Sequence, residues 1–311
     1  MSKYLTKINT LKIFIPSMKN IAFLILISAV SSYKLLAQTN SLPTINQQES
    51  HILKSSINGT TYHLNISLPQ NYSINDTTHY PILLMLDGGL GFPIAHASRT
   101  GMDMFGGLKD VIIVGIEYEW DKSFAPWMTN RWTDFTPTKD SISDENPAFR
   151  KAFELPSGSL ASGGAKFFFN VIKNEIIPFV DKEYKTNTDR GISGHSLGGL
   201  FVSYCLLSKP GFFSKYGINS PSLWWNGKVM FDIEKSYSEN HSELPAKVFM
   251  SVGSLEGKSM TPVMTEFADT LRSRNYNGLY LTTYVFEGET HTSVVPAMIS
   301  RTLKVLYSPE K

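Results

Sequence analysis

The sequence predicts a doubly wound α/β domain with a mostly parallel sheet. Two continuous apolar runs, 81–86 and 111–116, have the length and composition of strands that helices cover on both faces. Two further strand-like runs, 247–252 and 279–286, flank a helix-like segment at 261–274. Because strands and helices alternate along the chain, we expect one large domain built on a single sheet.

Length and composition are consistent with one large core. The chain has 311 residues, 42% of them hydrophobic, and a formal net charge of +2. Its lysines and arginines are scattered, so neither nucleic acid nor an anionic membrane is expected as a partner, and a small molecule is. The single cysteine, Cys205, cannot form an internal disulfide and is expected to be a buried small hydrophobe.

The N-terminal segment has the pattern of a secretory signal. An apolar run at 21–30 is preceded by Lys19 and followed by small and polar residues. We expect residues 1–37 to be a signal peptide, with Met18 as an alternative true start, and the mature protein to be periplasmic or secreted by a bacterium. The apolar run is too short to span a bilayer comfortably, and the alternative is an uncleaved N-terminal anchor.

The mature chain is expected to begin with a flexible segment, 38–50, which is rich in Thr, Asn, Ser and Gln. The catalytic domain then covers residues 51–311. An alternating run at 61–68 predicts a half-exposed strand, paired with 51–57 across an Asn-Gly turn. These two strands should be antiparallel and lie at the edge of the sheet.

One long stretch, 119–164, shows no sustained period although it carries Trp120, Trp127 and Trp132. Connections of this length in compact domains are usually functional. We interpret the stretch as a partly ordered, cap-like loop over the catalytic edge of the sheet. The alternative is that the tryptophans only anchor a long loop to the core.

The motif Gly-His-Ser-Leu-Gly-Gly at 194–199 predicts a nucleophilic serine, Ser196. It lies between a short strand-like run, 189–193, and an apolar helix at 200–207. This is the order of a nucleophile elbow, in which glycines on either side of the serine avoid collisions with the neighbouring strand and helix.

A serine nucleophile needs a histidine that accepts its proton. His291 follows the strand that ends at Phe286 and precedes a helix-like segment, which is the expected position of that base. After Ser196 the other histidine is His241, which lies in a polar run that is expected to be exposed, so His291 is favoured.

The acid of the triad is predicted to be Glu256, in the turn that follows the strand ending near Val252. Glu289, two residues before His291, is a competitor. If neither carboxylate reaches the histidine, a Ser-His dyad remains.

The oxyanion of the tetrahedral intermediate needs two preset N–H donors. One is expected from Leu197, the residue after the nucleophile, and the other from Gly89 in the glycine-rich loop 87–91. The alternative for these glycines is that they only make a tight turn.

With these residues in place, the chain resembles an esterase branch of the α/β hydrolases. This branch includes siderophore esterases of the enterobactin-hydrolysing kind and, more distantly, esterase D and the antigen 85 acyltransferases. The resemblance covers about 61–306 and is carried by the segments 86–88, 130–138, 163–165, 194–201, 220–225 and 288–294.

The resemblance implies the α/β-hydrolase fold, with Ser196 as nucleophile and His291 as base. It also implies that Arg131 contacts substrate oxygens, a role that suits the guanidinium fork. The alternative is a salt bridge from Arg131 to Asp134 that shapes the loop. We further expect the substrate site to be lined by Trp127, Trp132 and Trp225.

Together these observations predict a serine carboxylic-ester hydrolase that works through an acyl-enzyme on siderophore-type or other polar esters. No metal or cofactor is expected. Three alternatives stay open: an acyltransferase of the antigen 85 type, an esterase of acetylated or feruloylated carbohydrates, and a non-catalytic binding protein on the same scaffold.

Overall fold

A computed structural model describes residues 48–104, 106–119 and 124–309 of the chain. The predicted signal peptide, Trp120 and most of the segment expected to be flexible lie outside these residues. The last three residues of that segment, 48–50, already belong to a strand. Within the described ranges, no helix is both long enough and apolar enough to cross a membrane.

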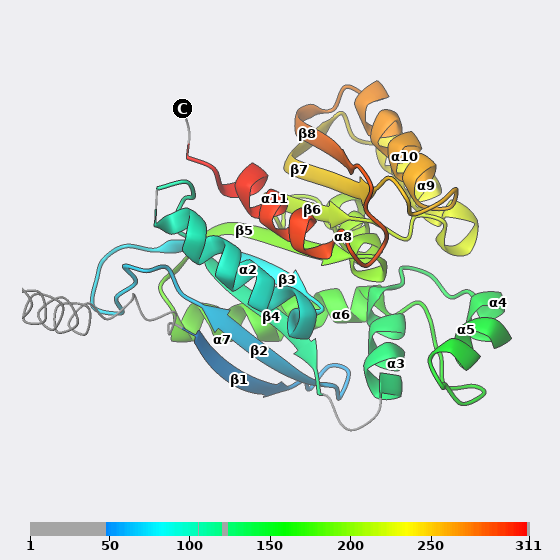
Figure 1. The fold of residues 1–311 in the computed structure, drawn as a ribbon, viewed down its shortest axis with the longest axis horizontal. Coiled ribbons are helices and arrows are strands. Elements are labelled where there is room, and N and C mark those ends of the chain that lie inside the picture. The colour runs from blue at the N-terminus through cyan, green and yellow to red at the C-terminus, as the bar shows by residue number, and fades with distance from the viewer. Residues whose placement is uncertain (1–47, 105, 120–123, 310–311) are drawn as a thin grey trace, which may run out of the picture. The chain divides into compact units, whose positions relative to one another are not determined.

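The described residues form one eight-stranded sheet with the order β1-β2-β4-β3-β5-β6-β7-β8 (Figure 1). The first two pairings, β1 with β2 and β2 with β4, are antiparallel, and all the others are parallel. The predicted doubly wound, mostly parallel sheet is therefore confirmed. The strands are β1 (Gln48–Lys54), β2 (Thr61–Ser67), β3 (Tyr80–Leu86), β4 (Ile112–Tyr118), β5 (Thr186–His195), β6 (Lys215–Asn219), β7 (Glu243–Gly253) and β8 (Asn277–Phe286).

The predicted N-terminal hairpin is present, although one of its strands is not at the edge. Strand β1 is the edge strand, and its residue Leu53 is the register partner of Tyr62 in β2. Strand β2 also pairs with β4, so it lies inside the sheet. Its buried residues alternate with partly exposed ones, as the sequence pattern predicted.

Helices cover both faces of the sheet. Figure 1 shows α2 and α11 side by side on one face, where they pack on β3, β4 and β7, while the other long helices lie on the opposite face. The helices are α2 (Gly88–Asp103), α3 (Phe124–Phe135), α4 (Ser141–Asp144), α5 (Pro147–Ala152), α6 (Ala165–Val171), a π-helical turn η1 (Ile172–Ile176), α7 (Ile177–Glu183), α8 (Leu197–Ser208), α9 (Trp225–Ser238), α10 (Thr261–Ser273) and α11 (Val295–Tyr307).

The stretch 119–164 is more regular than the sequence predicted, because it contains the helices α3, α4 and α5. The last two are short and are defined by their caps. Asp140 accepts the N–H groups of Ile142 and Ser143 at the start of α4, and Asn146 caps α5 in the same way. Helices of four and six residues are too short to show a hydrophobic period.

Helix α3 is anchored to the sheet through Asp134. The hydroxyl of Tyr62 donates to this carboxylate at 2.7 Å, and the hydroxyl of Tyr118 donates to the same oxygen at 3.1 Å. Burial raises the pKa of Asp134 to about 7, although the two tyrosine hydroxyls lower it. The helix that carries Arg131 is thus fixed by a buried acid that is half protonated near neutral pH.

This acid makes stability depend on pH. A carboxyl group whose pKa is raised by folding, here from 3.8 to about 7, takes stability away as pH rises through that interval. We expect Asp134→Asn, which keeps an oxygen that accepts from the tyrosines, to flatten the decline in melting temperature between pH 4 and 7. The exposed pair residue Asp269, changed to Asn, is the control. An unchanged pH profile in Asp134→Asn would contradict the assignment.

Candidate active site

Strand β5 ends at His195 and helix α8 begins at Leu197, so Ser196 lies on the turn between them. Its backbone has φ 61° and ψ −119°, a conformation that is strained for a residue with a side chain. The N–H of Ser196 donates to the carbonyl of Asn219 at 3.0 Å. This is the strand, turn and helix arrangement that the motif predicted.

The glycines around Ser196 have unequal roles. A Cβ at Gly194 would lie 2.5 Å from the backbone carbon and oxygen of Gly198, so this position requires glycine. A Cβ at Gly198 would come no closer than 3.4 Å to its nearest neighbour, a carboxylate oxygen of Asp87. The second demanding position is Gly199, where a Cβ would lie 2.7 Å from the carbonyl oxygen of Asn219.

The loops after β7 and β8 bring Glu256 and His291 together, with Nδ1 of the imidazole 2.6 Å from Oε2 of the carboxylate. The other carboxylate oxygen accepts the hydroxyl of Ser220 and the N–H of Gly253, each at 2.6 Å. Burial favours the neutral acid, but these hydrogen bonds together hold the pKa of Glu256 below its ordinary value. Glu256 is therefore an ionised partner for the imidazole.

The competing residues lie elsewhere. Glu289 accepts a hydrogen bond from Ser293, not from His291. His241 is exposed and stacks on Tyr237, with ring centroids 4.3 Å apart. The structure thus pairs His291 with Glu256 rather than with Glu289, and it keeps His241 away from the cavity.

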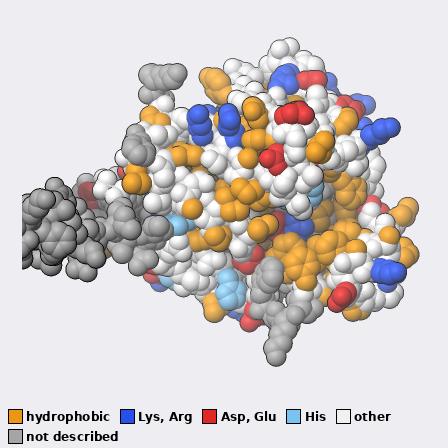
Figure 2. Space-filling model, in the orientation of Figure 1, with side chains coloured by type: hydrophobic (Ala, Val, Ile, Leu, Met, Phe, Trp, Pro, Cys, Tyr) orange, Lys and Arg blue, Asp and Glu red, His pale blue; other side chains and the backbone are white. Residues whose placement is uncertain are grey.

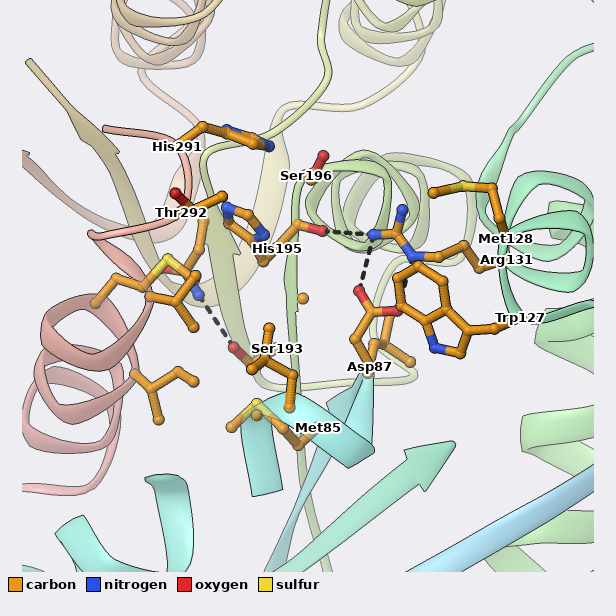
Figure 3. A pocket seen from close by; sticks show the side chains of 18 of the residues that line it. Met85, Asp87, Trp127, Met128, Arg131, Ser193, His195, Ser196, His291 and Thr292 are labelled. Carbon is orange, nitrogen blue, oxygen red and sulfur yellow. Dashed lines mark hydrogen bonds and ion pairs between the residues drawn. The ribbon is translucent and has the colours of Figure 1, made fainter. Parts of the chain in front are cut away.

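Ser196 and His291 lie at the same cavity, and no hydrogen bond joins their side chains. Figure 3 shows the His291 ring beside the Ser196 hydroxyl. The serine Oγ is instead 3.5 Å from the Oγ of Ser222, which is a long contact. The hydrogen bond between a catalytic serine and its base is commonly long and shortens when a substrate binds.

His195, the residue before the nucleophile, was not singled out from the sequence. Its ring lies 4.4 Å from that of His291, and its side chain lines the cavity. Burial, followed by the nearby His291 and Arg131, holds the pKa of His195 well below its ordinary value. A neutral aromatic ring therefore packs against the candidate base. The position of this histidine within the elbow motif was the available signal.

The predicted oxyanion donors differ in availability. Leu197 is the first residue of α8, so its N–H has no carbonyl within the helix to bind. The N–H of Gly89, in contrast, donates to Oε2 of Glu117 at 2.5 Å. This N–H is thus engaged by a side chain, and the role of Gly89 as an oxyanion donor stays a prediction that requires Glu117 to give it up. Burial and the charge of Asp87 raise the pKa of Glu117, against the hydrogen bonds that it accepts.

Arg131 is buried and paired. Its Nε and one terminal nitrogen donate to the two carboxylate oxygens of Asp87 at 2.8 and 2.9 Å, and its guanidinium lies 4.7 Å from the ring centroid of Trp127. The alternative of a salt bridge to Asp134 is wrong, because that carboxylate is occupied by two tyrosine hydroxyls. The charge of Arg131 faces the cavity but is neutralised by Asp87.

Only one of the three predicted substrate-binding tryptophans lines the cavity, and it is Trp127. Trp132 is 2% exposed and donates its indole N–H to Asp144 at 2.7 Å. Trp225 is fully buried and packs edge-on against Trp132, with ring centroids 5.0 Å apart. This corrects the prediction for Trp132 and Trp225, which join the loop to the core.

The cavity in front of Ser196 has a volume of about 250 Å³. Figure 2 shows hydrophobic side chains gathered over α3 beside the hollow. Among the described lining residues, the charged side chains are Asp87 and Arg131, which pair with each other. The apolar lining includes Leu90, Trp127, Met128, Val295, Met298 and Ile299.

In the described part of the chain, no cluster of three His, Cys, Asp or Glu side chains could hold a metal ion.

A comparison with known families identifies the group to which this site belongs. The model of the family described as "Putative esterase" matches residues 55–292, which is most of the chain. The chain belongs to this esterase family. It is accordingly a carboxylic-ester hydrolase with the α/β-hydrolase fold.

The relatives of this esterase include proteins of known activity. It is 31% identical over 283 residues to the ferri-bacillibactin esterase BesA of Bacillus subtilis, covering 88% of this chain and 93% of that protein. It is 26% identical over 287 residues to a siderophore triacetylfusarinine C esterase of Aspergillus fumigatus, covering 80% and 89%. The crystal structure of the BES protein from Bacillus cereus superposes with a TM-score of 0.70 at 30% identity, covering 84% and 94%.

The unequal glycines give a test of the elbow in this esterase. Gly194→Ala should destabilise the fold by about 1–3 kcal/mol, the usual cost of overpacking, because its Cβ would meet backbone rather than a movable side chain. It should also slow labelling of Ser196 by a fluorophosphonate. Gly198→Ala is the matched control and should change both quantities little. Equal effects of the two substitutions on melting temperature and labelling would contradict this reading.

Proposed function

We propose that Ser196, His291 and Glu256 form the catalytic triad of this esterase. The observation that carries the proposal is the 2.6 Å contact between His291 and Glu256 at the cavity that also contains the strained Ser196. Each residue has the surroundings that its role requires. The nucleophile is on a half-buried turn at the cavity, and the acid is ionised and bound to Nδ1 of the imidazole, which leaves Nε2 for the serine.

In the proposed reaction, Oγ of Ser196 attacks the ester carbonyl carbon while Nε2 of His291 takes the hydroxyl proton. Glu256 stabilises the resulting imidazolium by accepting the Nδ1–H of His291. The N–H of Leu197 donates to the oxyanion. Breaking of the carbon–oxygen bond releases the alcohol with the proton from His291, and a water molecule then hydrolyses the acyl-enzyme by the same route in reverse.

The substrate is proposed to be a siderophore-type ester, since the named relatives act on ferri-bacillibactin and triacetylfusarinine C. The lining of the cavity indicates which kind of substrate group can enter it. Arg131 already pairs with Asp87, and the surrounding side chains are mainly apolar. The part of the substrate that enters the cavity is therefore proposed to be uncharged, because a charge without a partner would lose its hydration.

We also propose that the enzyme is exported and acts in the periplasm or outside the cell. The proposal rests on the basic and apolar pattern of residues 19–38. Sequencing the N-terminus of the mature protein after expression in a Gram-negative host, with and without this segment, tests it.

The triad is tested by single substitutions. Ser196→Ala should lower kcat by roughly a millionfold, because the nucleophile is lost. Glu256→Gln should cost less than His291→Ala, since the acid orients the imidazole whereas the histidine moves the proton in both half-reactions. The measurements are ester hydrolysis and fluorophosphonate labelling, with peptide mass spectrometry to locate the label.

Folding of each variant is checked by its melting temperature. Labelling of a serine other than Ser196, or activity of Ser196→Ala within tenfold of the wild type, would refute the triad. A near-zero effect of Glu256→Gln would instead leave a Ser-His dyad.

The proposed selectivity for uncharged groups is tested with a matched pair of esters. The enzyme should hydrolyse p-nitrophenyl hexanoate at least about tenfold faster, in kcat/KM, than the monoanionic p-nitrophenyl adipate, because the terminal carboxylate would be buried without a cation. Rates are corrected for spontaneous hydrolysis. Equal rates for the two esters would show that the acyl chain does not enter the cavity as proposed.

A further inference from the structure

The short segment 219–222 begins with the last residue of β6 and connects the nucleophile to the acid. On one side, the carbonyl of Asn219 accepts the N–H of Ser196, and the N–H of Ser222 donates to the carbonyl of Ser196, both at 3.0 Å. On the other side, the hydroxyl of Ser220 donates to Oε1 of Glu256 at 2.6 Å. One short run of chain thus contacts two members of the proposed triad.

The contact with Ser220 matters because the acid is a glutamate. A glutamate has one more rotatable bond than the aspartate that is more usual at this position, so more side-chain freedom must be removed to hold its carboxylate in one orientation. The hydroxyl of Ser220 and the N–H of Gly253 both bind Oε1. Oε2 is thereby left for His291, at 2.6 Å.

The backbone of Ser220 is itself in an unfavourable conformation. Its φ is 40°, in the left-handed region where glycine would be the easier residue. The residue is fully buried, and its N–H donates to the carbonyl of Ser251 at 2.6 Å. A serine at a position suited to glycine indicates that its side chain has a use that outweighs the strain.

We propose that Ser220 is a positioning residue that acts through Glu256. Its hydroxyl fixes the carboxylate so that Oε2 meets the imidazole of His291. This inference rests on the proposed triad. Ser220 does not touch the reacting atoms, so its removal should lower kcat and leave KM unchanged.

Two substitutions of the same residue separate the hydroxyl from the backbone strain. Ser220→Ala removes the hydroxyl and keeps the strain, whereas Ser220→Gly removes both. We expect both variants to lose about 10- to 100-fold in kcat, the scale of a lost hydrogen bond to a charged group, with KM unchanged. The matched control is Ser203→Ala, a buried serine in α8 whose hydroxyl binds Gly199 of its own helix. Near-normal kcat in either Ser220 variant would overturn the proposal.

A double-mutant cycle shows whether Ser220 acts through the acid. In a Glu256→Gln background, Ser220→Ala should cost less than about threefold in kcat, because there is no carboxylate left to orient. A full additional loss in that background would overturn the proposal. These outcomes differ from failure of the triad, in which Glu256→Gln alone would have no effect or the fluorophosphonate would not label Ser196.

Discussion

The backbone of Ser196 is the constraint on which the rest of the site depends. Its conformation costs on the order of 1–3 kcal/mol and persists only because the surrounding structure holds it. The holding groups are backbone hydrogen bonds to Asn219 and from Ser222, together with the packing that excludes any side chain at Gly194 and Gly199. The close approach of β5, β6 and α8 therefore holds Ser196 in the conformation that presents its hydroxyl.

A second constraint is the electrostatic balance of the cavity. A buried guanidinium loses much hydration, so Arg131 requires a bidentate partner, and Asp87 at the end of β3 supplies it. This pair joins α3 to the sheet and neutralises both charges beside the nucleophile. The guanidinium also lies over the ring of Trp127. The pair of Arg131 with Asp87 thus holds α3 in place and also neutralises the cation that an anionic substrate group would have needed.

The sequence predicted the order of strands and helices because their apolar runs are local signals. It predicted Ser196, Glu256 and His291 as a group because all three follow strands whose carboxyl ends meet at one edge of a parallel sheet. It did not predict the partner of Arg131. Asp134 is three residues away on the same helix, yet Asp87, 44 residues away, forms the pair. Such a choice depends on burial and on competing tyrosines, which no local pattern contains.

The hydrogen bond from Gly89 to Glu117 is likewise set by long-range packing that no local sequence pattern contains. Spacing alone placed this N–H at the oxyanion, but the fold brings Glu117 to it from β4. That carboxyl lies near the carboxylate of Asp87, and their repulsion adds to burial in raising the pKa of Glu117. A developing oxyanion at Gly89 would thus have to displace an acceptor that is already bound. By contrast, the N–H of Leu197 is part of the positive N-terminal end of α8 and has no acceptor within that helix. The helix end is therefore the stronger electrostatic feature of the site, and it is fixed by the same turn that strains Ser196.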